Sequence, residues 1–275
     1  MSIWAGGSVE ASSIRGAVLT PARIGSLVEA LSPGVAGRWD EVNAVVLRVE
    51  GAAPSGLGEE AVLAGANAGA IKTTAGWEFV QFRQAALIGP QTWRLTGLLR
   101  AQRGTEAEMA AGGAAGAVVV FLDESLPRAD AMAGERGLPM IWSAGPRGGP
   151  AGGAGVTRRD VTLRGTHNRP FSPAHLRVTA EGGGRRVRWI ARTRTGGDVW
   201  EGEPVASDPL TFRIRVLDDG LVRRAFEVDG TDAVYADTDI AADFPAGFGV
   251  HARVGVAQSD GRMGWGSESL VELMA

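Results

Sequence analysis

The chain has 275 residues, of which 44% are hydrophobic, and a formal net charge of −3 at pH 7. That length allows one large domain or two ordinary ones, and the slightly acidic charge argues against the basic face of a general nucleic-acid-binding protein. The absence of Cys excludes disulfides, thiolate metal sites and Cys nucleophiles. No apolar run reaches the roughly 18 residues of a membrane span, and the N-terminal residues lack the basic start of a signal peptide. Forty-one Gly and 13 Pro are typical of a turn-rich β protein.

Residues 1–165 are predicted to form a β-rich domain, an irregular β-barrel or sandwich with one or two short helices. The clearest alternation of side chains lies at residues 77–85 and 93–99 and predicts two antiparallel strands of a hairpin. After this hairpin, Thr105 is a candidate N-cap for a helix, with Glu106 in its first turn. The other elements expected in this region are strands at 13–19, 43–49, 118–122 and 156–163 and helices at 58–64 and 105–111.

Residues 166–275 are predicted to form a second, fibronectin type III-like sandwich. The Gly- and Pro-rich stretch 144–155 indicates an exposed loop or a connection between domains. Pro170 and Pro173 cannot donate ladder hydrogen bonds and fit the entry to a new domain. Short strands separated by turns follow, in the number and spacing of an immunoglobulin-like sandwich, with Trp189 as its core tryptophan. These strands are expected at 175–180, 186–192, 210–216, 222–228, 233–236, 251–258 and 269–273.

The sequence contains no pattern typical of catalysis or of a metal or cofactor site. His167, His175 and His251 lie far apart, whereas a zinc site needs three or four converging ligands. No Gly-x-Ser-x-Gly nucleophile elbow is present. Residues 237–239 (Asp-Thr-Asp) are a weak candidate for a cation loop and fit a plain turn better. We therefore expect no enzyme, no catalytic residues, no cofactor and no metal.

The carboxylate pairs also disfavour an enzyme such as a cell-wall hydrolase. Hydrolysis of a glycoside requires two carboxylates that converge on one bond. The nearest candidates are Glu59 with Glu60 and Glu106 with Glu108, and residues one or two apart on a helix do not face each other.

The arginines leave alternatives open. Arg100 and Arg103 either place an anion at a helix start or, as we favour, bind nearby acids such as Glu106 or backbone carbonyls. Other arginines occupy alternating strand positions and so share a face, namely Arg186, Arg188, Arg192 and Arg194, and likewise Arg213 and Arg215. Such a face either binds an acidic polysaccharide or an acidic partner subunit, or is a solvated face balanced by acids. We favour the second, because antiparallel sheets usually keep one face polar. The candidate acids are Glu201, Glu203 and Asp208.

The hairpin region carries a long motif. It reads W-E-x-x-Q-F-x-x-A-x-L from Trp77 to Leu87 and continues as W-x-L-x-G-L-L-R-A-Q-R-G-T-E from Trp93 to Glu106. This region resembles the C-terminal part of the tail-tip, or baseplate hub, proteins of gene transfer agents and related siphophages. Two positions depart from that family's pattern, since Trp93 replaces Tyr and Ala101 replaces Gly. Weaker correspondences at 21–25, 63–68, 167–173 and 189–194 extend the resemblance over most of the chain.

The resemblance implies a structural virion protein at the distal end of a phage-like tail, assembled in the host cytoplasm. It implies other tail-tip or baseplate proteins as partners and a homotrimer in the assembled tail. The net charge and the lack of a long apolar run separately predict no nucleic acid and no membrane span. The alternative is an adsorption module that binds a host receptor or surface glycan. Trp200 and Trp265 lie in predicted loops of the second domain, where aromatic rings either stack on sugars or fold back onto the sandwich.

Overall fold

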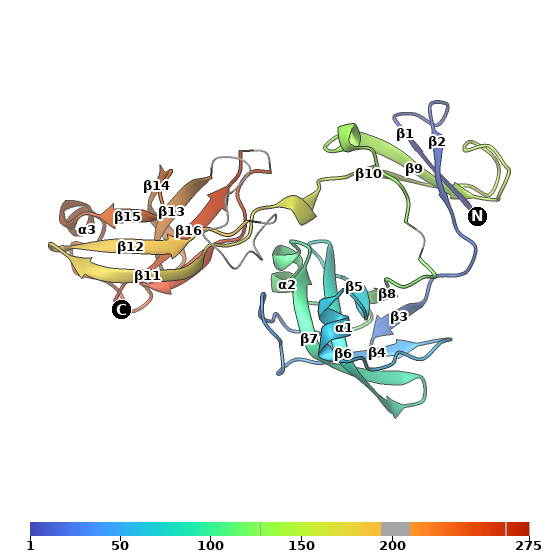
Figure 1. Ribbon diagram of the computed structural model, residues 1–275, viewed down its shortest axis with the longest axis horizontal. Coiled ribbons are helices and arrows are strands. Elements are labelled where there is room, and N and C mark those ends of the chain that lie inside the picture. The colour runs from blue at the N-terminus through green and yellow to red at the C-terminus, as the bar shows by residue number, and fades with distance from the viewer. Residues whose placement is uncertain (127, 194–209, 262, 275) are drawn as a thin grey trace. The chain divides into compact units, whose positions relative to one another are not determined.

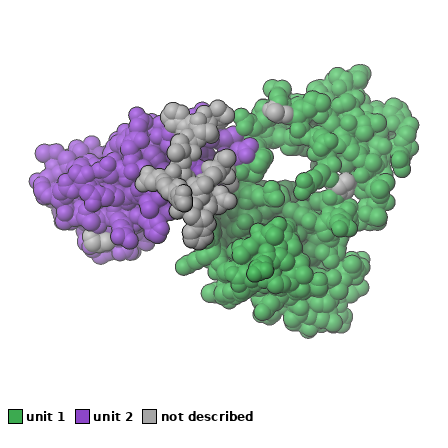
Figure 2. Space-filling model, viewed as in Figure 1, with its two compact units in different colours: residues 1–167 green, residues 168–275 purple. Residues whose placement is uncertain are grey.

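The computed structural model describes residues 1–126, 128–193, 210–261 and 263–274. The chain is mainly β, as predicted, and forms two compact units, Met1–His167 and Asn168–Ala275. Figure 2 shows the two units in different colours. The division lies two residues beyond the boundary drawn from the sequence. No helix of the described residues is long and apolar enough to cross a membrane.

Unit 1 contains a four-stranded antiparallel sheet in the order β10-β9-β1-β2. Its strands are β1 (Ser2–Gly6), β2 (Ser13–Ala17), β9 (Pro139–Gly145) and β10 (Thr157–Thr162). The central pair joins the two ends of the unit, since Trp4 on β1 pairs with Ser143 on β9. The sheet therefore depends on a pairing between segments that are far apart in sequence.

The intervening chain forms a closed antiparallel barrel in the order β3-β4-β7-β6-β5-β8 (Figure 1). Its strands are β3 (Ile24–Leu27), β4 (Val45–Val49), β5 (Ala68–Lys72), β6 (Trp77–Gly89), β7 (Thr92–Gln102) and β8 (Val118–Phe121). The helices α1 (Glu59–Leu63) and α2 (Glu106–Ala111) pack against it. Buried Leu47, Ile71 and Leu98 fill the barrel, and the rings of Phe82 and Phe121 meet edge to face at 6.4 Å. Because each of the six strands pairs with a neighbour on both sides, the barrel has no edge strand.

The predicted elements of unit 1 are present, but the prediction was incomplete. It missed β1, β3, β5 and β9, and it described one barrel or sandwich where the structure has a barrel inserted between β2 and β9 of a separate sheet. The predicted loop at 144–155 also begins too early, because β9 continues to Gly145.

Unit 2 consists of a three-stranded and a four-stranded antiparallel sheet, and all seven predicted strands are present. The first sheet has the order β11 (Ala174–Glu181), β12 (Gly184–Ile190), β15 (Asp232–Tyr235). The second has the order β14 (Leu221–Val228), β13 (Thr211–Asp218), β16 (Arg253–Ser259), β17 (Ser269–Glu272). Both sheets contribute apolar side chains to one core. Trp189 is buried there, with its ring 5.3 Å from that of Phe212, which confirms it as the core tryptophan.

One element of unit 2 contradicts the sequence reading. Residues 237–239 form neither a cation loop nor a plain turn, because they begin the helix α3 (Asp237–Asp243). Acidic residues suit that position, since the free backbone N–H groups of a first helical turn favour negative charge.

Candidate functional site

The sequence motif converges on a buried ion pair at the wall of the barrel. Arg100 on β7 is fully buried. Its Nε donates a hydrogen bond to Glu78 Oε1 at 2.6 Å and its Nη2 donates one to Glu78 Oε2 at 2.9 Å. This bidentate geometry is the strongest that an arginine and a carboxylate form. The backbone N–H of Ala101 adds a third bond to Glu78 at 3.3 Å, so the buried carboxylate is well satisfied.

A second carboxylate completes the surroundings of Arg100. Nη1 of Arg100 donates to the Ser32 carbonyl at 3.2 Å and lies 3.5 Å from Oδ2 of Asp40. Burial raises the pKa of Asp40, but hydrogen bonds from Asn43 and Val42 and the charge of Arg100 outweigh it, and the net pKa lies below its ordinary value. Asp40 is therefore ionised at neutral pH. The prediction that Arg100 binds acids or carbonyls is confirmed, whereas its named partner, Glu106, was wrong.

Two more motif residues support the backbone. Gln81 donates from its side-chain amide to the carbonyls of Val62 at 2.6 Å and Ala66 at 2.9 Å, at the end of α1. Thr105 accepts a hydrogen bond from the Phe79 N–H at 3.1 Å. The prediction that its side chain caps α2 was wrong, because Thr105 makes no capping hydrogen bond to that helix. These groups satisfy buried backbone atoms that otherwise cost free energy.

The departure at position 101 now has a structural meaning. Ala101 has a φ of +55°, in the left-handed region that residues with a Cβ rarely adopt. It is the position at which the resembled family has Gly. The following Arg103 also has a positive φ, is exposed and makes none of the ion pairs found among the described residues.

The predicted loop tryptophan Trp265 lies over the outer face of the four-stranded sheet of unit 2. It is half-buried, and the guanidinium of Arg213 lies 4.7 Å from its ring centroid. Arg215 donates hydrogen bonds through Nε and Nη2 to Glu268, the first at 2.7 Å. The segment 263–268 thus folds back onto the sheet. Binding of a glycan by Trp265 stays a prediction, and Trp200 lies outside the described residues.

The arginines of the three-stranded sheet have different surroundings. Arg186 donates hydrogen bonds to Glu181 and to Asp232, and Arg192 lies 4.6 Å from the ring centroid of Phe171. Arg188 is exposed on the same face as Arg186. The remaining residues of the predicted stripe and its counter-charges lie outside the described part of the chain, namely Arg194, Glu201, Glu203 and Asp208.

Sequence reasoning missed a polar cluster that anchors α3. Tyr235 is buried and its hydroxyl donates to Asp243 Oδ2 at 2.8 Å. Arg224 donates to the same carboxylate from Nε at 2.6 Å and from Nη2 at 3.1 Å. Burial and the bond to Asp243 raise the pKa of Tyr235, and the bond from Arg224 lowers the pKa of Asp243. No local sequence signal joins these three residues.

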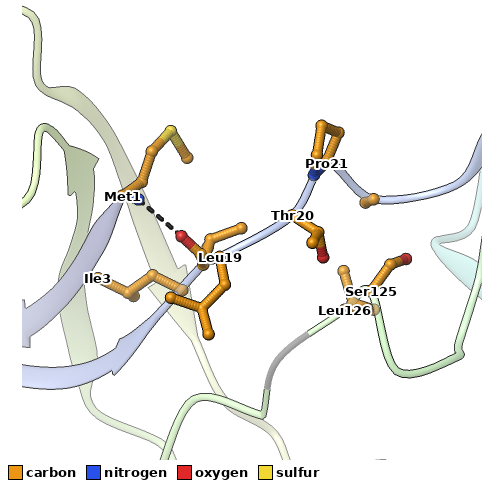
Figure 3. A pocket seen from close by; sticks show the side chains of 9 residues that line it. Met1, Ile3, Leu19, Thr20, Pro21, Ser125 and Leu126 are labelled. Atoms are coloured by element: carbon orange, nitrogen blue, oxygen red, sulfur yellow. Dashed lines mark hydrogen bonds between the residues drawn. The ribbon is translucent and has the colours of Figure 1, made fainter.

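A pocket of about 520 Å³ opens in unit 1, where chain segments lead from the sheet to the barrel (Figure 3). Its lining is mostly apolar, with Thr20 and Ser125 as the polar side chains among Met1, Ile3, Val18, Leu19, Pro21, Ala22 and Leu126. It contains no pair of titratable side chains. Within the described residues, no group of three or more His, Asp or Glu side chains is arranged to hold a metal ion.

The comparisons with known proteins bear on the barrel. The sequence model of the family described as "Rcc01698-like, C-terminal" matches residues 22–120, about a third of the chain. Among solved structures, domains A168–A170 of titin align with 96% of this chain and 70% of that one, at 11% identity and a TM-score of 0.26. So low a score carries no conclusion about fold or function. No curated protein matches the chain.

Proposed function

We propose that the chain is a structural component of a phage-like tail tip or baseplate hub, with the barrel as its defining module. One observation carries the proposal: the family match at residues 22–120 has nearly the same limits as the closed barrel, from Ile24 on β3 to Phe121 on β8. The match therefore corresponds to one complete structural module. The motif that suggested gene transfer agent and siphophage hub proteins lies within it.

The chemistry of the motif supports a structural role. Glu78, Gln81, Arg100 and Thr105 are all buried and bond to one another's strands or to nearby backbone. Groups held in this way stabilise a particular barrel and do not face a substrate. In this proposal the partners are other tail-tip proteins, the chain occurs as a homotrimer, and it resides at the tail tip of a particle assembled in the host cytoplasm.

The strand order of unit 2 supports a fibronectin type III-like domain within the same proposal. Three strands (β11, β12, β15) face four (β14, β13, β16, β17), in the seven-strand arrangement of such sandwiches. A module of this kind at the tail tip would place loops toward the host. Contact with a host receptor or glycan is the second candidate role, favoured only by the partial exposure of Trp265.

The proposal is tested on particles that carry a tagged version of the full chain. An epitope inserted between Gly148 and Gly149, in an exposed turn, leaves the strands intact. We expect antibody label at one end of the tail and, in a reconstruction, three copies of the barrel there. Complete tails that contain no copy of the chain would contradict the proposal.

A further inference from the structure

The two sheets of unit 2 treat their outward arginines differently. On the four-stranded sheet, Arg213 lies over Trp265 and Arg215 is paired with Glu268. On the three-stranded sheet, Arg177 of β11 and Arg188 of β12 stand directly opposite each other in the strand register, and both are exposed. Among the described residues, neither of these two lies within ion-pair distance of a carboxylate. Within the part of the chain that the structure describes, the first sheet is covered by its own chain, whereas this part of the second is not.

The acids on the face of the three-stranded sheet are already engaged. Arg186 binds Glu181 through Nε and Nη2 and binds Asp232 through Nη1. Asp232 is the register partner of Arg188, so Arg186 holds the carboxylate nearest in register to Arg188. Like charges directly opposite each other on neighbouring strands destabilise a sheet. The Arg177–Arg188 pair thus places two like charges opposite each other, and an external carboxylate would offset their repulsion.

The backbone beside this pair is irregular. The register of β11 shifts between Ala174 and Arg177, and within this bulge His175 has a φ of +50°. A bulge of this kind re-aims side chains and is common beside binding sites. It sits immediately before Arg177, on the strand that carries half of the arginine pair.

We propose that the outer face around Arg177 and Arg188 docks an acidic segment of a neighbouring protein subunit. Glu268 on Arg215 shows within the same unit how a carboxylate fits such an arginine. Ile190 and Val234 on the same face are each about half exposed, at 51% and 49%, and offer apolar contact to a polypeptide. The outward positions of the three strands carry no Phe, Tyr or Trp on which a sugar ring could stack. A protein partner therefore fits better than a glycan.

The proposal rests on the proposed function, because the partner is another subunit of the assembly. In particles, the full chain with Arg177→Glu and Arg188→Glu should be incorporated at least ~10-fold less than the wild type, since reversing both charges repels an acidic partner. The control carries Arg147→Glu and Arg159→Glu, the same change of charge at exposed positions of unit 1, and should be incorporated normally.

A photo-crosslinking residue at the exposed position of Thr179, on the same face, identifies what touches it. We expect a crosslink to an Asp- or Glu-rich peptide of another subunit, lost in the double charge reversal. A wild-type chain absent from particles contradicts the proposed function. If the wild-type chain is present in particles and the charge-reversed chain is incorporated equally well, the docking surface alone is overturned. Crosslinks to a glycan would overturn it too.

A stability measurement on the purified full chain separates docking from an internal role. Arg177→Gln should raise the Tm of unit 2 by about 1 to 4 °C, because it removes one of two opposed like charges on the edge strand of the sheet. A fall in Tm would mean that Arg177 is paired within its own chain, and the proposal would be wrong.

Discussion

The barrel and the sandwich place their charged groups in opposite ways. The barrel buries an arginine and two carboxylates, Arg100 with Glu78 and Asp40, in its wall. The sandwich has an apolar core around Trp189 and holds Arg186, Arg213 and Arg215 on the outer faces of its sheets, while partly exposed Arg224 binds Asp243 beside buried Tyr235. A conspicuous polar motif in the sequence can therefore report internal bonding, while the surface that we propose for a partner lies in the region with the less distinctive sequence.

The largest expected difference between the two units comes from removing the carboxylate of Glu78, which is buried in the barrel. Glu78→Leu leaves Arg100 charged and buried with only Asp40 and the Ser32 carbonyl, and should cost about 3–5 kcal/mol of unfolding free energy. Hydrogen exchange should show faster exchange in β6 and β7 and no change in β13 and β16.

Two variants serve as controls for that change. Glu59→Leu removes a carboxylate that is 54% exposed and paired with Arg83 in the same unit, and should cost at most about 1 kcal/mol. The double variant Glu78→Leu/Arg100→Met removes both charges of the pair and should recover most of the loss, because Asp40 keeps its hydrogen bonds from Val42 and Asn43. If Glu78→Leu alone is as mild as Glu59→Leu, the buried pair does not hold the barrel.

The polar cluster of the sandwich should contribute less to the free energy of unfolding than the buried pair of the barrel, and its contribution should depend on pH. Tyr235→Phe removes the bond to Asp243 and should cost about 1–2 kcal/mol at neutral pH. Because the folded state raises the pKa of Tyr235, its contribution is complete below the unfolded value near 10 and is lost as pH rises above it. The variant should therefore lose less stability than the wild type in alkali.

Tyr235 is the only tyrosine of the chain, so the absorbance of its phenolate reports this residue alone. In the wild type we expect the phenolate to form together with the unfolding of unit 2. Ionisation at the ordinary pKa of tyrosine in a chain that remains folded would contradict the arrangement around Asp243.

The smallest effect concerns the strained residue of the motif. Ala101→Gly should stabilise the barrel by about 0.5 kcal/mol, because relief of the left-handed strain exceeds the added freedom of the unfolded chain. Ala70 on β5 is equally buried, at 6% exposed, and has no positive φ. Ala70→Gly should destabilise by about 0.5–1 kcal/mol. Equal effects at the two positions, measured by chemical denaturation, would show that Ala101 is unstrained.

Local patterns predicted the strands that alternate clearly. Every strand of the sandwich, and the β6–β7 hairpin, could be placed because inward and outward side chains differ in polarity. β5 has the sequence Ala-Gly-Ala-Ile-Lys, in which small residues hide the alternation, and β9 begins at Pro139. Strands of this kind are specified by their neighbours in the sheet and less by their own residues.

The sequence did not predict which side chains bind each other when they lie far apart along the chain. Arg100 binds Glu78 across the β6–β7 pair and Asp40 from a preceding loop, whereas the sequence suggested the neighbouring Glu106. Tyr235, Arg224 and Asp243 likewise come from three separate elements. Charge and spacing show that a polar residue needs a partner, and only the closed barrel and packed sheets show which one it has.

The first and last strands of the barrel are neighbours, with Ile24 opposite Val120. The four-stranded sheet of unit 1 therefore receives nearly a hundred inserted residues through two adjacent chain ends, as it would receive a short hairpin. Once the barrel has folded, the entropy cost of bringing β2 and β9 into one sheet depends on the linkers 18–23 and 122–138 on either side of it. The geometry thus allows the barrel to be replaced or duplicated as one unit without a change in the strand order of the sheet that carries it.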